Sequence, residues 1–356
     1  MRIASLVSGG VDSSVTLQLL KEQGLNPVIF YIVIGMEDKA GFMDCPKEED
    51  IEITKYLAKK YGFQMEIVDL HDEYWKTVAK YTLDTVKQGH TPNPDVMCNR
   101  LIKFGAFNDK FGKEFDVITS GHYAGTIEKD GEKYLRTAVD RHKDQTYFLG
   151  QITRDQLQKA MFPLQDIPKP EVRRIANEMK LPSANRPDSQ GICFLGKVNY
   201  RDFIKQYVGE NPGEIRDLET NRVIGQHQGL WFHTIGQRKG LGLSQGPWFV
   251  VKKDIPNNIV YVSNGYDPAA QYRSQIDLGN FEFINGKTDR DYTIEQDIKF
   301  KIRHTPEFAS GKIIQKDDQF IIKADNPIAG VAPGQFGVIY TPDEQICLGG
   351  GVILEY

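Results

Sequence analysis

A glycine-rich turn near the start of the chain constrains the fold more than any other feature. The segment Ser8–Ser14 (SGGVDSS) follows the apolar run Ile3–Val7 and leads into Ser13–Gln23, whose apolar residues have helical spacing. Two adjacent glycines let a backbone pass close to an anion, and N–H groups at a helix start, together with serine hydroxyls, can surround a phosphate. The sequence therefore predicts a strand–turn–helix unit that binds phosphate. Asp12 is expected to hold Mg²⁺ or to orient the pyrophosphate end of a nucleotide.

Segments typical of strands and helices alternate through the first part of the chain. Strands are expected at Val28–Ile34, Met65–Val68 and Asp116–Thr119, and helices at Lys47–Tyr61 and Tyr74–Lys87. This alternation predicts a doubly wound parallel sheet, in which ligands bind at the carboxyl ends of the strands. The glycine-rich turn and the pair Gly121-His122 both follow predicted strands, so both are expected at that edge.

The character of the sequence changes after about residue 205. Glycines become frequent, and short β-prone segments follow at Trp248–Lys252 and Asn258–Val262. Further strands are expected at Ile298–Ile302, Lys312–Gln315, Gln319–Lys323, Gly337–Tyr340 and Gly351–Leu354, with a spacing that suits a small barrel or sandwich. We therefore divide the chain into an α/β domain at 1–204, a small β-rich domain at 205–272 and a C-terminal β domain at 273–356.

Cysteine usage and hydropathy bear on the cellular compartment. The four cysteines, Cys45, Cys98, Cys193 and Cys347, include no C-x-x-C pair and are too few for a disulfide scaffold in 356 residues. No apolar run approaches the roughly 20 residues of a membrane-spanning helix, and no signal peptide is recognisable. We expect a cytoplasmic protein with reduced thiols and no membrane partner. Cys347, within an expected strand, is interpreted as a core residue.

The net charge of −4 argues mildly against nucleic acid as a partner. Basic residues nevertheless cluster in three places: Arg136, Arg141, Lys143 and Arg154; Lys169, Arg173 and Arg174; and Lys299, Lys301, Arg303 and His304. Because runs of charge are most often solvated surface, composition alone favours that interpretation. Nucleic-acid binding would depend on how these clusters are distributed over the surface.

The segment Thr91–Asn99 contains a cysteine in a proline-rich setting. Its two prolines predict that no helix forms through Asp95 and that one begins near Cys98. A thiol at a helix N-terminus has a stabilised thiolate, and Asp95 is close enough to exchange a proton with it. Taken alone, however, Cys98 is more often a small buried apolar residue than a nucleophile.

A second cysteine, Cys193, lies in a segment that Pro182, Pro187 and Gly191 predict to be a loop. A cysteine in such a loop is more often exposed than one in a strand, so a nucleophile is plausible there. Cys98 and Cys193 are far apart in sequence, so only the fold can bring them together.

The glycine-rich turn is neither a Walker A loop nor G-x-G-x-x-G. It resembles the S-G-G-x-D-S loop of the ATP pyrophosphatase group, whose members split ATP to AMP and pyrophosphate while adenylating a carbonyl oxygen. With its other motifs, the chain resembles the tRNA-specific 2-thiouridylase family over essentially its whole length. The segments that carry this resemblance are Ser8–Ser14, Thr91–Asn99, Gly121–Tyr123, Lys143–Leu149, Asp188–Phe194 and Pro333–Gln335.

The resemblance implies an ATP-dependent tRNA uridine 2-sulfurtransferase that makes 2-thiouridine at the wobble position, with ATP and Mg²⁺ as cofactors. Adenylation gives the C2 oxygen of uracil the leaving-group character it lacks, and the base must first leave the anticodon stack. The implied partners are tRNAs of the Lys, Glu and Gln type and a sulfur donor, either a cysteine desulfurase or a relay protein. The implied architecture is an ATP domain, a small central β-rich domain and a C-terminal β-barrel.

Site residues follow from the same resemblance. Cys193 would carry a persulfide, Cys98 would attack it and leave a transient Cys98–Cys193 disulfide, and Asp95 would be the acid or base; release of hydrogen sulfide in the pocket is an open alternative. ATP would be bound by Leu6, Val7, Ser8, Gly9, Gly10, Val11, Asp12, Ser13, Ile32 and Gly121. Asn93, Pro94 and Asp95 would line the flipped uracil, and tRNA would contact His122, Lys143, Asp144, Gln145, Arg303, His304 and Gln335.

Two features depart from the family pattern. Ile32 stands where the family usually has Met near the adenine, which a backbone contact would tolerate. Cys45 lies in an unusual segment, Gly41–Pro46, without a partner motif, and is interpreted as a non-catalytic thiol.

Two other functions compete with sulfur transfer. An amination enzyme of the same superfamily would use the turn Ser8–Ser14 but would need neither Cys98 nor Cys193. A non-enzymatic RNA-binding module would carry a degenerate ATP loop, whereas the loop in this chain is intact.

Overall fold

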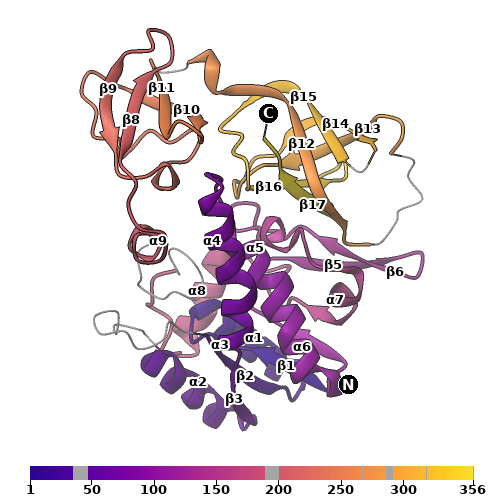
Figure 1. The fold of residues 1–356 in the computed structure, drawn as a ribbon. Helices are drawn as coiled ribbons and strands as arrows, with labels where there is room; N and C mark the ends of the chain where they lie inside the picture. Colours follow the sequence, from indigo (N-terminus) through magenta and orange to yellow (C-terminus); the bar gives the residue numbers. More distant parts are fainter. Residues whose placement is uncertain (35–46, 189–199, 266–267, 286–291, 318, 356) are drawn as a thin grey trace.

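The computed structural model describes residues 1–34, 47–188, 200–265, 268–285, 292–317 and 319–355. A five-stranded sheet forms the N-terminal part (Figure 1). Its strands are β1 (Ile3–Leu6), β2 (Val28–Val33), β3 (Met65–Asp69), β4 (Val117–Thr119) and β7 (Ala160–Met161), in the order β3-β2-β1-β4-β7. Every pairing in it is parallel, which confirms the predicted doubly wound sheet. Because β1 and β4 are neighbours, the turns that leave their carboxyl ends lie side by side.

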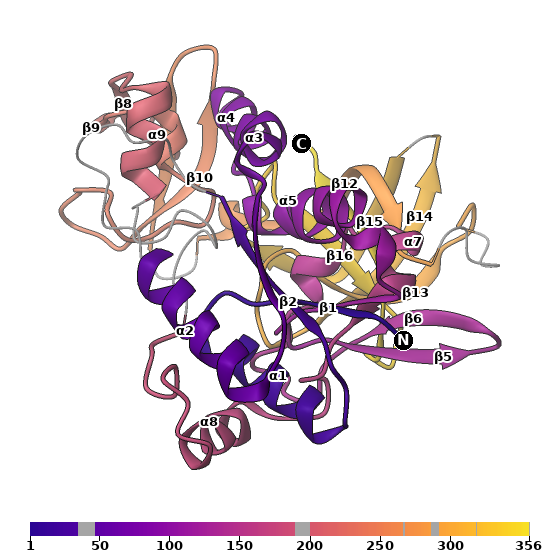
Figure 2. The same cartoon turned by 90° about the horizontal axis from the view of Figure 1, so that it is seen from below.

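Helices cover both faces of this sheet (Figure 2). On one face, α1 (Val11–Glu22), α2 (Lys47–Tyr61) and α8 (Lys169–Glu178) bury a shared apolar cluster. On the other face, a second cluster is formed by α3 (His71–Tyr74), α4 (Lys80–Lys87), α5 (Pro94–Cys98), α6 (Phe107–Lys110) and α7 (Arg154–Lys159). The helix predicted at Lys47–Tyr61 is confirmed. The one predicted at Tyr74–Lys87 already begins at His71 and includes a π-helical stretch, Trp75–Ala79.

The C-terminal part is a closed six-stranded antiparallel barrel. Its strands are β12 (Tyr272–Phe283), β13 (Gln296–Lys301), β14 (Ala309–Lys316), β15 (Gln319–Ala329), β16 (Phe336–Tyr340) and β17 (Ile346–Ile353). Pairing between β12 and β17 closes the barrel around Leu278, Phe300 and Ile322, all essentially inaccessible to solvent. The strand pattern left barrel and sandwich open, and the structure has the barrel.

A hairpin from the N-terminal part joins this barrel sheet. Strands β5 (Gly125–Lys129) and β6 (Glu132–Arg136) pair with each other, and β6 pairs with β17 through Leu135 and Cys347. Backbone hydrogen bonds thereby connect the two parts of the chain. Cys347 is fully buried in this seam, which confirms its interpretation as a core residue.

The central part is a small four-stranded sheet with its own core. Its strands are β8 (Gly213–Asp217), β9 (Val223–His227), β10 (Trp248–Asp254) and β11 (Ile259–Asn264), in the order β10-β11-β8-β9. Helix α9 (Tyr200–Val208) packs Phe203 and Ile204 against Val86 of α4. Figure 1 shows the end of α4 between the central sheet and the barrel.

Within the described residues, every helix is too short or too polar to cross a membrane.

Candidate functional site

The glycine-rich turn joins β1 to α1, as predicted. Gly9 has a positive φ of 72°, and a Cβ on it would lie 2.8 Å from the Cα of Asp50 in α2, so this position requires glycine. The hydroxyls of Ser13 and Ser14 donate to the carbonyl oxygen of Gly10, at 3.1 and 2.8 Å. The Ser14 hydroxyl is buried and also hydrogen-bonded to Ser183, so it stabilises the turn and is not accessible to a ligand.

Gly121 places the end of β4 directly against this turn. A Cβ on Gly121 would lie 2.8 Å from the backbone nitrogen of Ser13 and 3.0 Å from the carbonyl carbon of Asp12. The two carboxyl-end segments predicted from the sequence therefore meet. On the neighbouring strand β2, Ile32 packs its partly buried side chain into the core next to the turn.

The carboxylate of Asp12 lies in a network of charged and polar groups. Its Oδ1 accepts from the hydroxyl of Tyr123 at 2.8 Å and from Nζ of Lys169 at 2.6 Å. Lys169 Nζ is also 2.9 Å from Oδ1 of Asp188, whose Oδ2 is 2.6 Å from Lys143 Nζ. Burial alone would raise the pKa of Asp188, but the two ammonium groups outweigh it and hold that pKa well below its usual range.

The basic cluster at 169–174 is only partly surface. Lys169 is buried, and Arg173 donates to Asp188 at 2.6 Å, whereas Arg174 is exposed and pairs with Glu171 and Glu178. The interpretation as solvated surface is therefore wrong for Lys169 and Arg173. Charge alone could not separate the three, because the difference comes from which side of α8 each residue occupies.

Arg186 supports the same turn from another side. Its Nη1 donates to the carbonyl oxygen of Gly9 at 3.0 Å and to Oδ1 of Asp50 at 2.6 Å. Burial raises the pKa of Asp50, and the guanidinium of Arg186 offsets part of that effect. Neither Arg186 nor Tyr123 was singled out as a site residue from the sequence, since both act on the turn through tertiary contacts.

The predicted start of the helix near Cys98 is wrong. The helix begins at Pro94, with Asn93 as its N-cap accepting from the backbone N–H of Val96 at 3.4 Å. Proline is favoured at the first helical position because its missing N–H has no intrahelical partner there and its φ suits the helix. Cys98 thus lies one turn inside a continuous helical segment, 1% exposed, on the same face as Asp95.

The barrel holds the segment before this helix. Gln335 Nε2 donates to the carbonyl oxygens of Pro92 and Thr91, at 2.9 and 3.2 Å, and its Oε1 accepts from Asn93 Nδ2 at 3.2 Å. The backbone N–H of Thr91 donates to the carbonyl oxygen of Pro333 at 2.9 Å. The fold therefore brings Gln335 of the barrel next to the segment Asn93–Asp95, although the two are far apart in the sequence.

Several residues expected at the RNA surface are engaged inside the protein. His122 is buried, shares a 2.7 Å hydrogen bond with Ser120, and burial lowers its pKa well below the usual range. Asp144 is buried, accepts from Thr146 at 2.7 Å and faces the fully covered ammonium of Lys301 at 3.7 Å.

Two neighbours of Asp144 are also internally bonded. His304 stacks on Phe148 and shares a 2.9 Å hydrogen bond with the carbonyl oxygen of Asp144. Gln145 accepts from the backbone N–H of Tyr123 at 2.9 Å. The hydrogen bond between His304 and Asp144 joins the barrel to the α/β part, whereas Gln145 and Tyr123 both belong to the α/β part.

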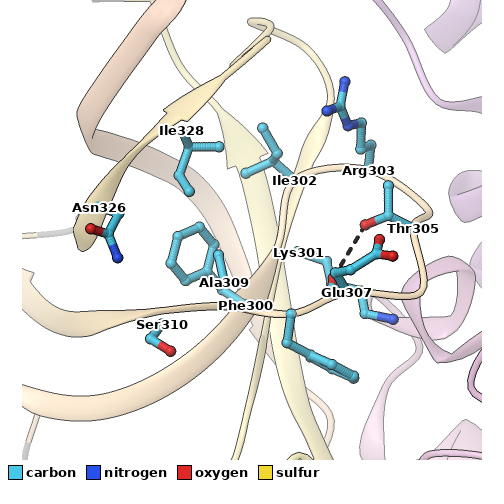
Figure 3. A pocket seen from close by; sticks show the side chains of 11 residues that line it. Phe300, Lys301, Ile302, Arg303, Thr305, Glu307, Ala309, Ser310, Asn326 and Ile328 are labelled. Carbon is cyan, nitrogen blue, oxygen red and sulfur yellow. Dashed lines mark hydrogen bonds between the residues drawn. The ribbon is translucent and has the colours of Figure 1, made fainter.

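Arg303 lies elsewhere, at a hollow on the barrel. This cavity of about 420 Å³ is lined by Lys301, Thr305, Glu307 and Asn326 among others. In Figure 3 the guanidinium of Arg303 extends away from Lys301. Cys193 and Cys45 fall outside the described residues, so their relation to Cys98 is not part of this geometry.

Three family models match consecutive stretches of the chain. Residues 1–197 match a tRNA methyl transferase HUP domain, residues 201–264 a tRNA methyl transferase PRC-barrel domain, and residues 273–353 an aminomethyltransferase beta-barrel domain. With the parallel sheet and the glycine-rich turn, these matches define a HUP-type α/β protein that carries two small β domains.

Relatives that match over the full length show to which family within this class of proteins the chain belongs. A tRNA-specific 2-thiouridylase MnmA of Parabacteroides distasonis is 60% identical over 355 residues, covering 100% of this chain and 99% of that protein. A tRNA-specific 2-thiouridylase MnmA 1 of Bacteroides thetaiotaomicron and a tRNA-specific 2-thiouridylase MnmA of Porphyromonas gingivalis are each 56% identical, and the matches cover 99% and 100% of this chain, respectively, and 99% of each protein. The chain belongs to the tRNA-specific 2-thiouridylase family.

Proposed function

We propose that this chain is a tRNA uridine 2-sulfurtransferase, which adenylates the C2 oxygen of the wobble uridine with ATP and replaces that oxygen with sulfur. The observation that carries the proposal is the joining of two features in one chain. One is the turn at Asp12 with Lys169 beside it, and the other is the buried Cys98 on a helix whose entry is fixed by Gln335. An anion site and a thiol are both required for sulfur transfer to an activated base.

The turn and the start of α1 serve the nucleotide. Backbone N–H groups in the first turn of α1 have no intrahelical partner and the helix dipole favours negative charge there, which supports a phosphate at this position. Lys169 adds a positive charge 2.6 Å from Asp12, so the leaving pyrophosphate is stabilised as its charge develops. The edge of β1 and β2 around Leu6, Val7 and Ile32 is the proposed adenine side.

The residues at the turn also fit Mg²⁺. This ion is usually held by one or two carboxylates together with substrate phosphates and water. Asp12 offers such a carboxylate, because its Oδ2 takes no hydrogen bond from the described residues while Oδ1 is occupied. The described residues include no cluster of three potential ligands that could hold a metal independently of the nucleotide. When bound, Mg²⁺ would neutralise phosphate charge at this position.

The segment Asn93–Cys98 serves the base and the sulfur. Asn93, Pro94 and Asp95 line the proposed position of the flipped uracil, and Asp95 exchanges the proton at that position. By family resemblance, the outer sulfur of a Cys193 persulfide becomes bonded to C2, AMP leaves, and the Cys98 thiolate closes a disulfide with Cys193. A reductant then restores both thiols. Sulfide released in the pocket remains the alternative route. We propose tRNAs of the Lys, Glu and Gln type as substrates, with a cysteine desulfurase or relay protein as donor.

Nucleoside mass spectrometry tests this function. Unmodified tRNA is incubated with the protein, ATP, Mg²⁺, and either sulfide or a cysteine desulfurase with cysteine. The proposal requires a new 2-thiouridine that depends on ATP. Under desulfurase feeding, this product is lost in Cys98→Ser and in Cys193→Ser.

Cys45→Ser is the matched control, because it removes a thiol to which we assign no role. It should leave the yield of 2-thiouridine unchanged. AMP release without tRNA, together with no thionucleoside under either feeding, would instead identify an amination enzyme.

A further inference from the structure

A second cavity lies where the three parts of the chain meet. It has a volume of about 540 Å³, within the range of small-ligand sites. Its walls come from Gly89–Thr91 just after α4, from Lys252–Pro256 at the end of β10, and from Arg273, Pro333 and Glu355 of the C-terminal part. The contact between the segment after α4 and the central part is close, since a Cβ on Gly89 would lie 2.7 Å from the side chain of Ile255.

Lys253 places an uncompensated positive charge in this cavity. The residue as a whole is half-buried, but protein surrounds its ammonium group, and this burial lowers the pKa of Lys253 to about 8. Nζ donates to the carbonyl oxygen of Gly89 at 2.8 Å. Among the described residues no carboxylate lies within 4.0 Å of it. A covered ammonium without a counter-ion destabilises the free protein, and a ligand that supplies a negative charge would relieve this cost.

The acidic groups around the cavity already have other partners. Asp254 accepts from the backbone and side chain of Asn257 at 3.1 and 3.0 Å, and Glu355 is 2.7 Å from Nε2 of His90. Lys252 is exposed on the adjacent position of β10. The net character of the cavity is therefore cationic, which suits an anion.

The cavity shares its wall with the proposed base site. Thr91 and Pro333 line it, and these two residues are hydrogen-bonded to each other beside Gln335 and Asn93. An anion bound there would lie a few residues from the segment that receives the uracil. The nucleic-acid chain carries a phosphate on either side of a flipped base, and lysines are common partners of such phosphates.

We propose that this three-part cavity binds a phosphodiester group of the tRNA next to the target uridine, with Lys253 and Lys252 as its cationic contacts. The inference rests on the proposed function and deepens it, because the central part of the chain then takes a direct share in RNA binding. A free nucleotide or inorganic phosphate presents the same chemistry, and the experiment separates these sources.

The test measures tRNA affinity against salt concentration for wild type, Lys253→Met, Lys253→Arg and the control Lys59→Met. Lys59 is exposed on α2, so its substitution makes the same charge change away from the cavity. We expect Lys253→Met to weaken tRNA binding roughly tenfold at low salt and to lower the slope of log K against log salt by about 1. Lys253→Arg should recover most of the affinity, and Lys59→Met should match wild type.

A second measurement needs no variant. Lysine acetylation of the wild-type protein, followed by mass spectrometry, should show Lys252 protected by tRNA while Lys59 stays reactive. Equal affinity and equal salt slope for Lys253→Met, or an unprotected Lys252, would overturn the inference. So would protection of Lys252 by AMP or phosphate but not by tRNA. If wild type itself fails to bind tRNA, the proposed function fails instead, so the two failures are distinguishable.

Discussion

Nζ of Lys169 lies 2.6 Å from Oδ1 of Asp12, although 157 residues separate them in the chain. The lysine side chain is 11% exposed and also contacts Asp188, so one ammonium joins the start of α1 to the segment after α8. Asp12 is 31% exposed and Lys169 keeps Asp188 as a second partner, so the pair contributes less than the about 3–5 kcal/mol lost when a fully buried pair is broken. The pair therefore fixes the carboxylate that we assign to the magnesium–pyrophosphate end of ATP.

Replacing Asp12 should abolish the use of ATP. We expect Asp12→Ala to lower tRNA-dependent AMP formation roughly 10²-fold or more, because the phosphate end of the nucleotide loses its anchor. The measurement is release of labelled AMP in the presence of tRNA and Mg²⁺. Asp166→Ala is the control, since Asp166 is an exposed partner of Arg136 outside the site. AMP formation at the wild-type rate in Asp12→Ala would remove Asp12 from the nucleotide site.

Two glycines at the turn should respond differently to alanine. Gly121→Ala forces a Cβ to 2.8 Å from the backbone nitrogen of Ser13. We therefore expect the free energy of unfolding to fall by about 2 kcal/mol and ATP binding to be lost as well. At Gly10 the nearest atom to a new Cβ is 3.5 Å away, which is ordinary contact, so Gly10→Ala should fold normally. It should still bind ATP poorly, because the methyl group projects where a phosphate approaches. Thermal unfolding and ATP titration of both variants check this, and equal stability of the two would contradict it.

Gln335→Ala should uncouple ATP use from thiolation. Its amide makes three hydrogen bonds to Thr91–Asn93, so its loss should loosen the segment that we propose as the uracil site, while the contacts of Asp12 stay intact. We expect the thiolation rate to fall about 10-fold to 10²-fold while ATP affinity stays at the wild-type value. The exposed Gln345 offers the matched variant, Gln345→Ala, which should thiolate normally. A parallel fall in ATP affinity would show that the barrel contact acts on the whole site.

The pH dependence of stability should reveal how much the buried ammonium of Lys253 destabilises the folded protein. Burial lowers its pKa to about 8 in the folded protein, while the unfolded value is near 10.5. Between these values the unfolded chain binds more protons, so this group makes stability rise with pH across that window. Lys253→Met removes the penalty, so it should raise Tm relative to wild type at pH 7, by less at pH 9.5. A difference in Tm that is constant with pH would mean that the ammonium is not buried in solution.

Local sequence signals predicted the layout of the fold well. The alternation of strands and helices before residue 120 specified a parallel sheet, and the turn Ser8–Ser14 lies at its predicted edge. The predicted helix start near Cys98 is wrong because proline disrupts a helix in its interior but is favoured at the first helical position, which Pro94 occupies. The hairpin β5–β6 was not predicted, since its partner strand comes from the far end of the chain.

The candidate site was less accessible to sequence reasoning. Lys169 and Arg174 are equally charged and five residues apart, yet one is buried against Asp12 and the other is solvated. No local pattern distinguishes them, because the distinction depends on the packing of α8 against α1. His122 and Asp144 were expected at an RNA surface, yet both are buried and each is hydrogen-bonded to a side chain two residues away, which their polarity alone does not indicate.

Pairing of β6 with β17 also bears on how the chain is made. Leu135 and Arg136 leave the ribosome long before Cys347 and Ile346, with which they pair. Because domains form in order during synthesis, the β6 edge of the hairpin stays without its neighbour until β17 has been synthesised. A chain cut short before β17 would keep a folded nucleotide sheet but expose that edge to other chains. Strand β17 therefore completes the barrel and, in the same step, covers an edge prone to aggregation.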